Sequence, residues 1–527
     1  MDFVQKLVIC RACLNLSAQT NGVNAADSNL PASVSESRVR HFVWLLCLLA
    51  AVHVFVFSAV FPFFGTVDEQ IHFDLAVKYA AGHIPRALET VSTNTTPYVV
   101  IYGTHEYLWA SNNFPIAQFP PPWTRPMKEI GSDLLARQAA WNNAVNHEAS
   151  QPPLYYALAG AGWRAGMALG LHDGFLLYWL RFLNIFVVVA LVWLGFAAAR
   201  LIFPDNAFLK TGVPALLAFL PQSAFYSIQN DVLSPLTFGA AFLCLVKLLR
   251  TEIPGVRLGT LTGLALAATF LTKISNLPLL AVSGLVVLFK VWQLAKAGKL
   301  RAAFPPLVTL ALCAGLPIMV WLAWCKYAFG DFTGTAAKIQ FLGWTYKPFG
   351  EWWHHPIFTP HGLWTFVSGL MATFWRGELL WHRQPLASPI VDMIYTISSV
   401  AFVGVAVAAL LLRSGTVNAA QRQALWLGFW SLIAAVAFLG FLSIRYDFGD
   451  CFYPSQAHPY FTSGRLMLGA LIPFLLLYLY GLDRLLCRVK NNWLRPLVLV
   501  VLILFMVISE VCTDWRIFPN AYNWFHL

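Results

Sequence analysis

Residues 41–69 read HFVWLLCLLAAVHVFVFSAVFPFFGTVDE, an apolar run that ends in two adjacent carboxylates, Asp68 and Glu69. A helix needs roughly 20 apolar residues to cross the hydrocarbon core of a bilayer. The segment from His41 to Phe64 therefore predicts a transmembrane helix, and the acid pair lies where this helix leaves the membrane. Charge at such a boundary suits a substrate with a polar head and a tail in lipid.

The rest of the chain has the same apolar character. Of its 527 residues, 58% are hydrophobic and only 11% are charged, which is far from the composition of water-soluble domains. We predict an all-α polytopic membrane protein with about eleven transmembrane helices. The expected spans lie near residues 41–63, 178–202, 211–228, 232–250, 257–274, 276–294, 304–327, 389–413, 424–444, 466–486 and 493–511.

Basic residues are distributed unevenly between the predicted loops. The formal net charge is +11, but it is spread over many short loops without a basic, aromatic-rich patch, so we expect no nucleic-acid partner. If Leu154–Leu171 does not cross the membrane, the loops on one side carry fifteen Lys and Arg residues, and the short loops and tail on the other side carry four. Lys and Arg are enriched on the cytosolic side. We therefore predict that Leu154–Leu171 is an interfacial or re-entrant helix on the outer face.

This topology divides the chain into three parts. Residues 1–40 form a polar cytosolic tail, residues 41–511 a transmembrane domain, and residues 512–527 a tail on the outer side. The domain includes two long outer segments, 65–178 with interfacial helices and 327–389, whereas the cytosolic loops, at about a dozen residues each, are too short for a nucleotide-binding unit. The sequence contains no G-x-G-x-x-G, P-loop, H-E-x-x-H or G-x-S-x-G motif. Any chemistry is expected on the outer side.

Ionisable and amide residues recur at the predicted outer boundary. Several have a structural explanation: Thr66-Val67-Asp68-Glu69 has the pattern of a capping box, and Asp231 could cap the next helix. An arginine at the end of a span can also reach lipid headgroups without any substrate. The candidate site residues are Asp68, Glu69, His72, Gln151, Arg181, Asn230, Asp231, Lys273 and Arg465.

The order of these motifs resembles a known group of enzymes. It is similar to the GT-C superfamily of polyprenyl-phosphate-dependent glycosyltransferases over about residues 41–485, nearest the bacterial DUF2142 membrane proteins and more distantly the protein mannosyltransferase and aminoarabinose transferase types. The resemblance is carried by Val67-Asp68-Glu69-Gln70-Ile71-His72-Phe73, Gln151-Pro152-Pro153-Leu154-Tyr155-Tyr156, Arg181, Pro221, Asn230-Asp231, Lys273 and Ser463-Gly464-Arg465.

The resemblance implies an inverting membrane glycosyltransferase. It would move a sugar from a polyprenyl-phosphate donor to a hydroxyl of a glycan, lipid or protein, on the periplasmic face of a bacterial inner membrane. Asp68 corresponds to the catalytic acid and would take the proton of the acceptor, and Glu69 would position the acceptor or Asp68. The remaining candidates would bind the substrate, with the cations on the leaving phosphate: Arg465, Lys273 and Arg181, assisted by Asp231, Asn230, His72 and Gln151.

Two motifs depart from the family pattern. Gln151 stands where a histidine or lysine commonly precedes Pro-Pro, and Ser463-Gly464-Arg465-Leu466 stands where Gln-Gly-Arg-Tyr is usual. The role of that basic residue therefore does not transfer to Gln151, and His147 is the substitute that we consider. No cofactor is assigned, and a divalent cation stays open, because the acid pair together with Asp231 could bind Mg²⁺ or Mn²⁺ or could work without it.

Other function classes stay open. A lipid or oligosaccharide transporter would also cross the membrane many times, but it would favour inverted repeats and polar residues at the midplane. A polysaccharide polymerase or ligase would carry its chemistry on the segment 327–389 instead of on Asp68. A purely structural assembly protein would not need the charged residues at the outer boundary.

Overall fold

The computed structural model describes residues 32–104, 120–382, 384–412, 417–451, 453–489, 491 and 493–527, so most of the predicted tail 1–40 lies outside the described residues. Among these residues, nine helices are long and apolar enough to cross a membrane, and two shorter apolar helices, α9 and α11, accompany them. Except for 211–228, each predicted span has a helix at its position, and the polytopic all-α fold is confirmed. The membrane helices are α3 (Ala32–Val60), α8 (Asp173–Ile202), α9 (Ala207–Ala218), α10 (Ser234–Arg250), α11 (Val256–Thr272), α12 (Leu277–Lys296), α13 (Leu300–Phe329), α16 (Pro389–Leu411), α17 (Ala419–Arg445), α18 (Leu471–Leu486) and α19 (Leu494–Asp514).

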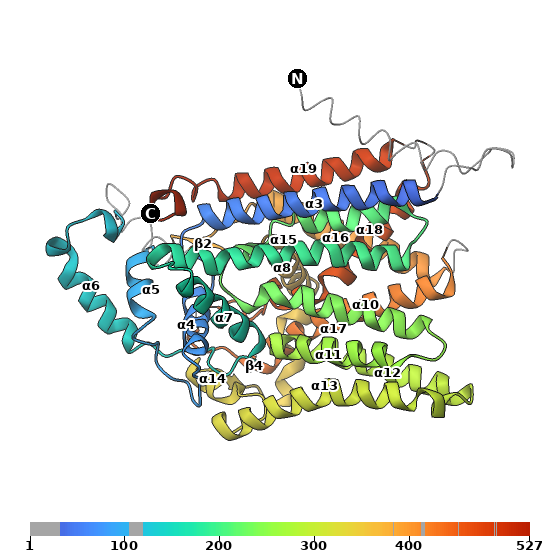
Figure 1. Cartoon of the computed structure of the whole chain (residues 1–527), viewed down its shortest axis with the longest axis horizontal. Helices are drawn as coiled ribbons and strands as arrows, with labels where there is room; N and C mark the ends of the chain where they lie inside the picture. The colour runs from blue at the N-terminus through green and yellow to red at the C-terminus, as the bar shows by residue number, and fades with distance from the viewer. Residues whose placement is uncertain are drawn as a thin grey trace.

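These helices lie side by side along the long axis of the molecule (Figure 1). Helix α18 is the most buried of them: within Gly464–Leu486, which contains α18 and the turn before it, 94% of the most apolar window lies inside the protein. At the periphery, only 11% of the corresponding window of α13 and 17% of that of α19 is buried. A helix that is apolar all round and yet exposed is suited to contact with lipid.

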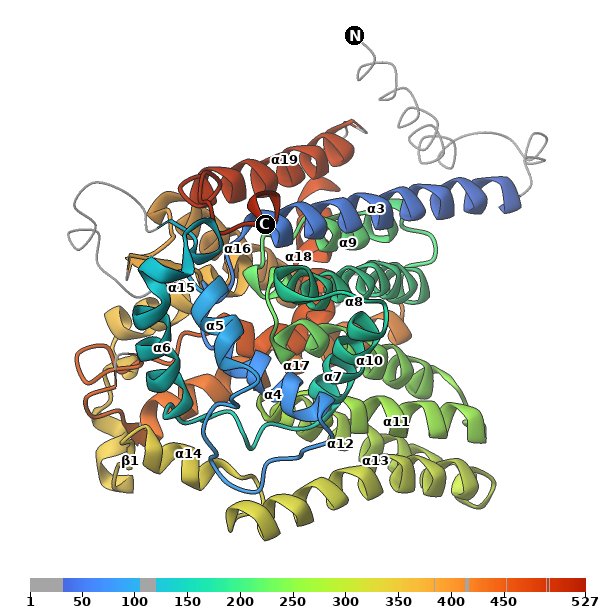
Figure 2. The same cartoon turned by 60° about the vertical axis from the view of Figure 1, so that its left-hand side comes forward.

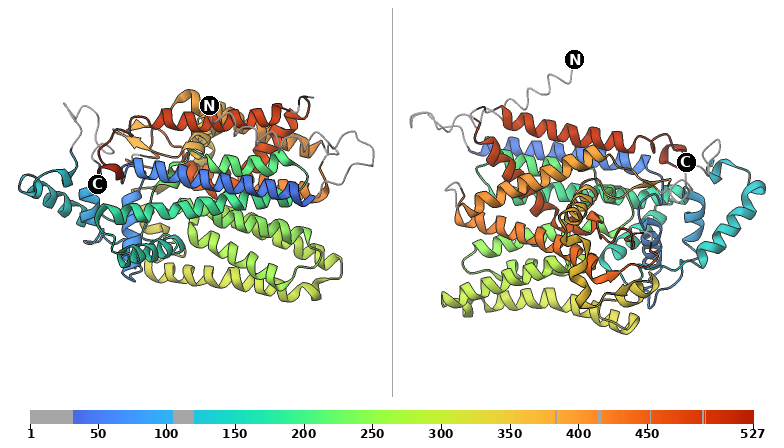
Figure 3. Two further views of the ribbon diagram at one scale, coloured as in Figure 1. Left: turned by 45° about the horizontal axis from the view of Figure 1, so that its top comes forward. Right: turned by 180° about the vertical axis from the view of Figure 1, so that it is seen from behind.

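Most of the remaining elements gather at one end of the bundle, the left-hand end in Figure 1, where the chain also ends (Figure 2). Helix α6 projects from this end in both views of Figure 3. The other helices are α4 (Glu69–Ala80), α5 (Thr96–Tyr102), α6 (Met127–Asn142), α7 (Leu154–Ala168), α14 (Thr335–Phe341) and α15 (Pro360–Arg376). Short strands pair as β1 (Thr345–Tyr346) with β4 (Tyr446–Asp447) and β2 (Leu380–Trp381) with β3 (Gln384–Pro385). The 3₁₀ turns are η3 (Pro122–Thr124), η4 (Ser223–Tyr226), η5 (Asn230–Leu233), η6 (Ile274–Asn276), η7 (Phe349–His354), η8 (Pro356–Phe358), η9 (Gly464–Ala470) and η10 (Trp524–His526).

Helix α7 lies within Leu154–Leu171, the segment that the distribution of Lys and Arg predicts not to cross the membrane. It has 15 residues, and among the described residues it is neither one of the nine candidate spans nor one of the two shorter apolar helices. Small residues let it approach its neighbours closely: a Cβ on Gly160 would lie 2.7 Å from the backbone nitrogen of Ala80 in α4, and one on Gly166 would lie 2.6 Å from the Leu176 side chain in α8. Helix α7 thus packs on α4 and on the first turns of α8, and its interfacial position stays a prediction.

The third predicted span, 211–228, differs from the structure. Helix α9 ends at Ala218, and the chain continues through Pro221 into η4 and η5, because proline cannot donate the hydrogen bond that a continued helix needs. Non-helical backbone at this depth requires partners within the protein. The Asn184 side chain of α8 provides them by donating to the carbonyl oxygens of Phe225 and Ser227.

The positions of α7 and α8 predict the result of a topology experiment. A reporter fused after Gly170 should report the outer face, and one fused after Asn206 should report the cytosol, because α8 crosses between them and the basic residues favour this orientation. Reporter activity or cysteine labelling in intact cells measures this. A cytosolic signal after Gly170 would show that α7 crosses the membrane.

Candidate functional site

The site is built around a buried ion pair between Glu69, at the start of α4, and Arg181, in α8. Both side chains are almost completely inaccessible, and Arg181 Nε and Nη2 donate to the two Glu69 carboxylate oxygens at 2.9 and 2.8 Å. The other Arg181 N–H groups donate to the carbonyl oxygens of Ser58, Phe61 and Pro62, where α3 ends. This pair therefore fixes the exit of α3 against α8.

Glu69 also holds two pieces of irregular backbone. Its carboxylate accepts from the backbone N–H of Phe64 at 2.9 Å and from that of Ile228, in the turn after α9, also at 2.9 Å. Between these anchors, Phe64 and Asp68 have φ angles of 60° and 64°, in the left-handed region. Such a conformation costs non-glycine residues about 1–2 kcal/mol and persists only where the surroundings enforce it. The Asp68 side chain is thereby turned away from its own helix, whose N–H groups it does not cap.

Asp68 meets Arg465, which lies at the start of η9. Arg465 Nη2 donates to Asp68 Oδ2 at 3.2 Å, its Nη1 to Asp231 at 3.3 Å, and its Nε to Glu378 at 2.9 Å. Asp231 is fully buried and accepts from Lys273 Nζ at 2.6 Å. The structure thus brings together four residues, Asp68, Asp231, Lys273 and Arg465, that are 42 to 397 positions apart in sequence.

A second group of charged residues lies near Oδ1, the other carboxylate oxygen of Asp68. His147 Nε2 is 3.4 Å from Asp68 Oδ1 and 3.8 Å from Glu148 Oε1. Glu148 accepts from Lys338 of α14, and the His147 ring lies parallel to that of Phe341 in the same helix, at 6.0 Å. Helix α14, from the outer segment 327–389, therefore covers the residues supplied by the outer segment 65–178.

The surrounding charges keep both carboxylates of this group ionised. Burial alone would raise the pKa of Asp68, but the hydrogen bond from His147 and the positive charges of Arg465 and Lys338 hold it well below its usual range. Burial also opposes ionisation of Glu148, yet Lys338 lowers the pKa of that carboxyl to about 2. The Asp68 side chain is 24% exposed, so this charged carboxylate can be reached from outside.

Three further predicted residues, Gln151, Asn230 and His72, lie in the elements next to Asp68 and Glu148. Gln151 Nε2 donates to Glu148 at 2.6 Å, and the Gln151 carbonyl oxygen accepts from Asn230 at 3.3 Å. His72, one turn after Asp68 in α4, bonds through Nδ1 to the hydroxyl of Tyr156 at 2.7 Å. Burial lowers the pKa of His72 to about 4, so the ring is neutral. These residues connect the outer segment 65–178 to η5.

Two predicted roles are corrected by this geometry. Glu69 is buried and bonded to Arg181, so it does not face an acceptor, and all the donors of Arg181 are used, so none is left for a phosphate. The capping box is also wrong: the Glu69 carboxylate accepts from Phe64 rather than from the backbone of Thr66. The predicted cation ligands Asp68, Glu69 and Asp231 do not converge, since Glu69 and Asp231 are bonded to Arg181 and Lys273.

The sequence analysis missed four residues of the cluster, Glu378, Glu148, Gln229 and Lys338. Glu378 accepts from Arg465 and from the Ser463 hydroxyl, Glu148 accepts from Lys338, and Gln229 accepts from Arg465 Nη1 at 3.2 Å. Of these, Glu148 is the residue that the sequence could most readily have indicated, because it directly follows His147, the proposed substitute for the basic residue before Pro-Pro. Glu378 and Lys338 lie in a long outer segment whose sequence has no periodic signal that would place them.

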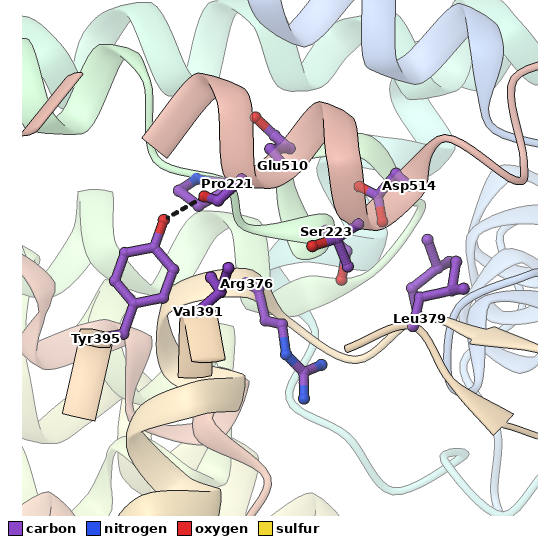
Figure 4. Close-up of a pocket in the computed structure, with 11 residues that line it drawn as sticks. Pro221, Ser223, Arg376, Leu379, Val391, Tyr395, Glu510 and Asp514 are labelled. Atoms are coloured by element: carbon purple, nitrogen blue, oxygen red, sulfur yellow. Dashed lines mark hydrogen bonds between the residues drawn. The ribbon is translucent and has the colours of Figure 1, made fainter. Parts of the chain in front are cut away.

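A separate cavity lies beside the cluster (Figure 4). Arg376 and Leu379 line it, whereas Glu378 between them reaches Arg465. Its wall includes Glu510 and Asp514, one turn apart in α19. Glu510 is held by His53 at 2.7 Å and by the Tyr226 hydroxyl at 2.6 Å, which ties α19 to α3 and η4. None of the nine predicted site residues lines this cavity.

Comparison with known proteins identifies the family. The family model of DUF2142, described as a predicted membrane protein, matches residues 51–444. This chain belongs to the DUF2142 family. No curated protein matches it. Among solved structures, ArnT from Cupriavidus metallidurans, crystallised with undecaprenyl phosphate, is similar over 85% of this chain and 79% of its own, with 12% identity and a TM-score of 0.31.

The family assignment confirms the resemblance to DUF2142 proteins, but its description states no activity. The likeness to ArnT is too low to transfer an activity or a ligand to this DUF2142 protein. Its function must therefore be argued from the cluster of Asp68, Arg465 and their neighbours.

The ion pair predicts a difference in stability between two adjacent acids. Glu69→Gln leaves the buried Arg181 charge without its partner and should cost about 3–5 kcal/mol of folding free energy. Asp68→Asn keeps a side chain of the same shape in a partly exposed position and should cost much less. Thermal unfolding of the purified protein measures both.

The exposed Glu129→Gln variant is the matched control, since its side chain is 58% exposed. Equal stability of the Glu69→Gln and Glu129→Gln proteins would contradict the assigned role of the ion pair.

Proposed function

We propose that this DUF2142 protein is an inverting membrane glycosyltransferase that moves a sugar from a polyprenyl-phosphate donor to an acceptor hydroxyl. One observation carries the proposal: Asp68 is an ionised, partly exposed carboxylate that is fixed 3.2 Å from an arginine where two membrane helices end. A reaction of this class needs a group that accepts a proton and cations that receive a phosphate. Asp68 and its neighbours supply both.

The proposed reaction is a single displacement. The acceptor oxygen attacks the anomeric carbon, the bond between that carbon and the phosphate oxygen breaks, and the bonding electrons leave with the lipid phosphate. Asp68 takes the proton that the acceptor hydroxyl loses. Attack opposite to the leaving phosphate inverts the anomeric carbon.

Arg465 and Lys338 are the proposed phosphate ligands. Arg465 is 11% exposed and Lys338 25%, whereas Lys273 is 5% exposed and bonded to the buried Asp231. The planar fork of an arginine matches two phosphate oxygens. Lys273 would then act indirectly, by neutralising Asp231 so that Arg465 can turn to the phosphate. The lipid tail of the donor would stay in the bilayer.

The segment 327–389 favours one composite site. It contributes Lys338 and Glu378, and both contact the residues around Asp68. A polymerase or ligase with its chemistry on this segment alone would not need these contacts. The proposed enzyme therefore uses the segment to cover and complete the Asp68 cluster.

Replacement of Asp68 by Asn tests the proton-accepting role. The amide keeps the size of the side chain but cannot take a proton, so transfer should fall by about 10²-fold or more while the folded protein persists. Mass spectrometry of envelope glycans and lipids, in cells that carry the parent protein, the variant or no protein, measures the transferred sugar.

Asp133→Asn is the control, because Asp133 is 65% exposed on α6. Undiminished transfer by the Asp68→Asn protein would exclude Asp68 as the base. Identical glycans in cells with and without the parent protein would argue against a transferase.

Arg465→Lys tests the phosphate contact. Lysine keeps the charge but loses the fork that reaches Asp68, Asp231 and Glu378, so turnover should fall about tenfold or more. The same glycan analysis measures turnover, with thermal unfolding in parallel. Arg125→Lys, whose parent side chain is 40% exposed, should change neither quantity. Parent-level turnover in the Arg465→Lys protein would remove Arg465 from the site.

A further inference from the structure

Three side chains with metal-binding atoms converge beside Asp68. His147 Nε2 lies 3.4 Å from Asp68 Oδ1 and 3.8 Å from Glu148 Oε1, and the three atoms all lie within 4.8 Å of one another. An ion at the centre of this triangle would be about 2.4 Å or less from each atom, which is in the range of bonds from divalent cations to nitrogen and oxygen. The spacing therefore fits a cation without rearrangement of the backbone.

These three residues are held in place by a second layer of contacts. Asn146 donates to the carbonyl oxygen of Ile71 at 3.1 Å and to Asp74 at 2.7 Å, which fixes the segment 146–148 against α4. Glu148 is further oriented by Gln151. Outer contacts of this kind set the direction of metal ligands and raise affinity.

The charges around Asp68 are out of balance for a site that receives a phosphate. Four carboxylates, those of Asp68, Glu148, Asp231 and Glu378, face three permanent cations, Lys273, Lys338 and Arg465. A phosphate would add one or two negative charges to this excess, next to the buried carboxylates of Asp231 and Glu148. A divalent cation reverses the imbalance and makes phosphate binding favourable.

A second observation comes from His72. Its side chain is 1% exposed, and Nε2 has no hydrogen-bond partner among the described residues. The ring lies close enough to Glu148, Lys273 and Asp68 that their charges act on it. A buried imidazole nitrogen without a partner usually marks a ligand or ordered water that completes the site. His72 lies one turn after Asp68 at the start of α4, and its other ring nitrogen is bonded to Tyr156.

We propose that Asp68, His147 and Glu148 bind one divalent transition-metal cation, such as Mn²⁺. Imidazole suits Zn²⁺ and other transition-metal ions, whereas Mg²⁺ and Ca²⁺ prefer oxygen ligands alone, and the two carboxylates are ligands that Mn²⁺ also accepts. One Asp68 oxygen binds the ion, and the other stays directed to Arg465 and the acceptor. The role of the ion in holding the donor phosphate rests on the proposed function, but its binding does not.

The ammonium group of Lys338 is bonded to the Glu148 oxygen that lies near His147, so it shares a ligand with the proposed ion. Binding of a cation would displace Lys338 from Glu148. The released ammonium group would then be free to contact the phosphate. Lys338 and the metal therefore compete for Glu148, which gives the experiment its sharpest test.

The experiment titrates Mn²⁺ into the purified full-length protein and follows the free ion by electron paramagnetic resonance. We expect one Mn²⁺ per chain, at least tenfold weaker binding in His147→Gln, and tighter binding in Lys338→Gln, which removes the competing cation. His361→Gln, an exposed histidine of α15, should bind as the parent does. Addition of excess Mg²⁺ should not displace the ion.

Absence of stoichiometric Mn²⁺ binding, or parent-like affinity in His147→Gln, would overturn the proposal. Weaker binding in Lys338→Gln would also contradict it, because Lys338 would then support the site instead of competing for it. The titration needs no sugar donor, so its outcome is independent of the transfer assays. Mn²⁺ binding together with undiminished transfer by Asp68→Asn would keep the metal site and reject the proposed base.

Discussion

The buried ion pair between Glu69 and Arg181 is the constraint on which the site depends. A charged pair out of contact with water is stable only when both partners are fully hydrogen-bonded, and here the carbonyl oxygens at the end of α3 and the N–H groups of Phe64 and Ile228 complete the set. Breaking the pair would therefore loosen α3, α8 and the turn after α9 together. Because Glu69 is fixed inward, its neighbour Asp68 is held in a left-handed conformation that directs it outward.

The adjacent acids Asp68 and Glu69 therefore have different environments. Glu69 is fully buried, and its carboxylate is paired with Arg181. The side chain of Asp68, in contrast, is 24% exposed. Arg465 then links Asp68 to Asp231 and Glu378, three acids that are far apart in the sequence. The cluster is therefore a meeting point of α4, η5, η9 and the segment after α15, and its geometry depends on how the whole bundle packs.

The sequence predicts the membrane helices well because each is a long apolar run, and chain composition alone carries that signal. It also predicts that Asp68, Asp231, Lys273 and Arg465 share one boundary, and the structure places these four residues in a chain of direct contacts. It fails where tertiary contacts decide. The capping-box pattern at Thr66 is overridden by Arg181, and the span 211–228 is shortened by Pro221. Lys338 and Glu378 reach the site from the long segment 327–389, whose sequence has no local pattern that predicts these contacts.

The balance of charge limits which substrates the cluster could accept. Every permanent cation near Asp68 already contacts a carboxylate, so an incoming anion must exchange those contacts rather than add to a free positive surface. Such an exchange is favourable only if the carboxylates gain a new partner at the same time, since a buried charge without one is costly. A proton from an acceptor hydroxyl or a divalent cation is such a partner. The site thus favours a reaction in which anion binding and neutralisation of Asp68 or Glu148 occur together.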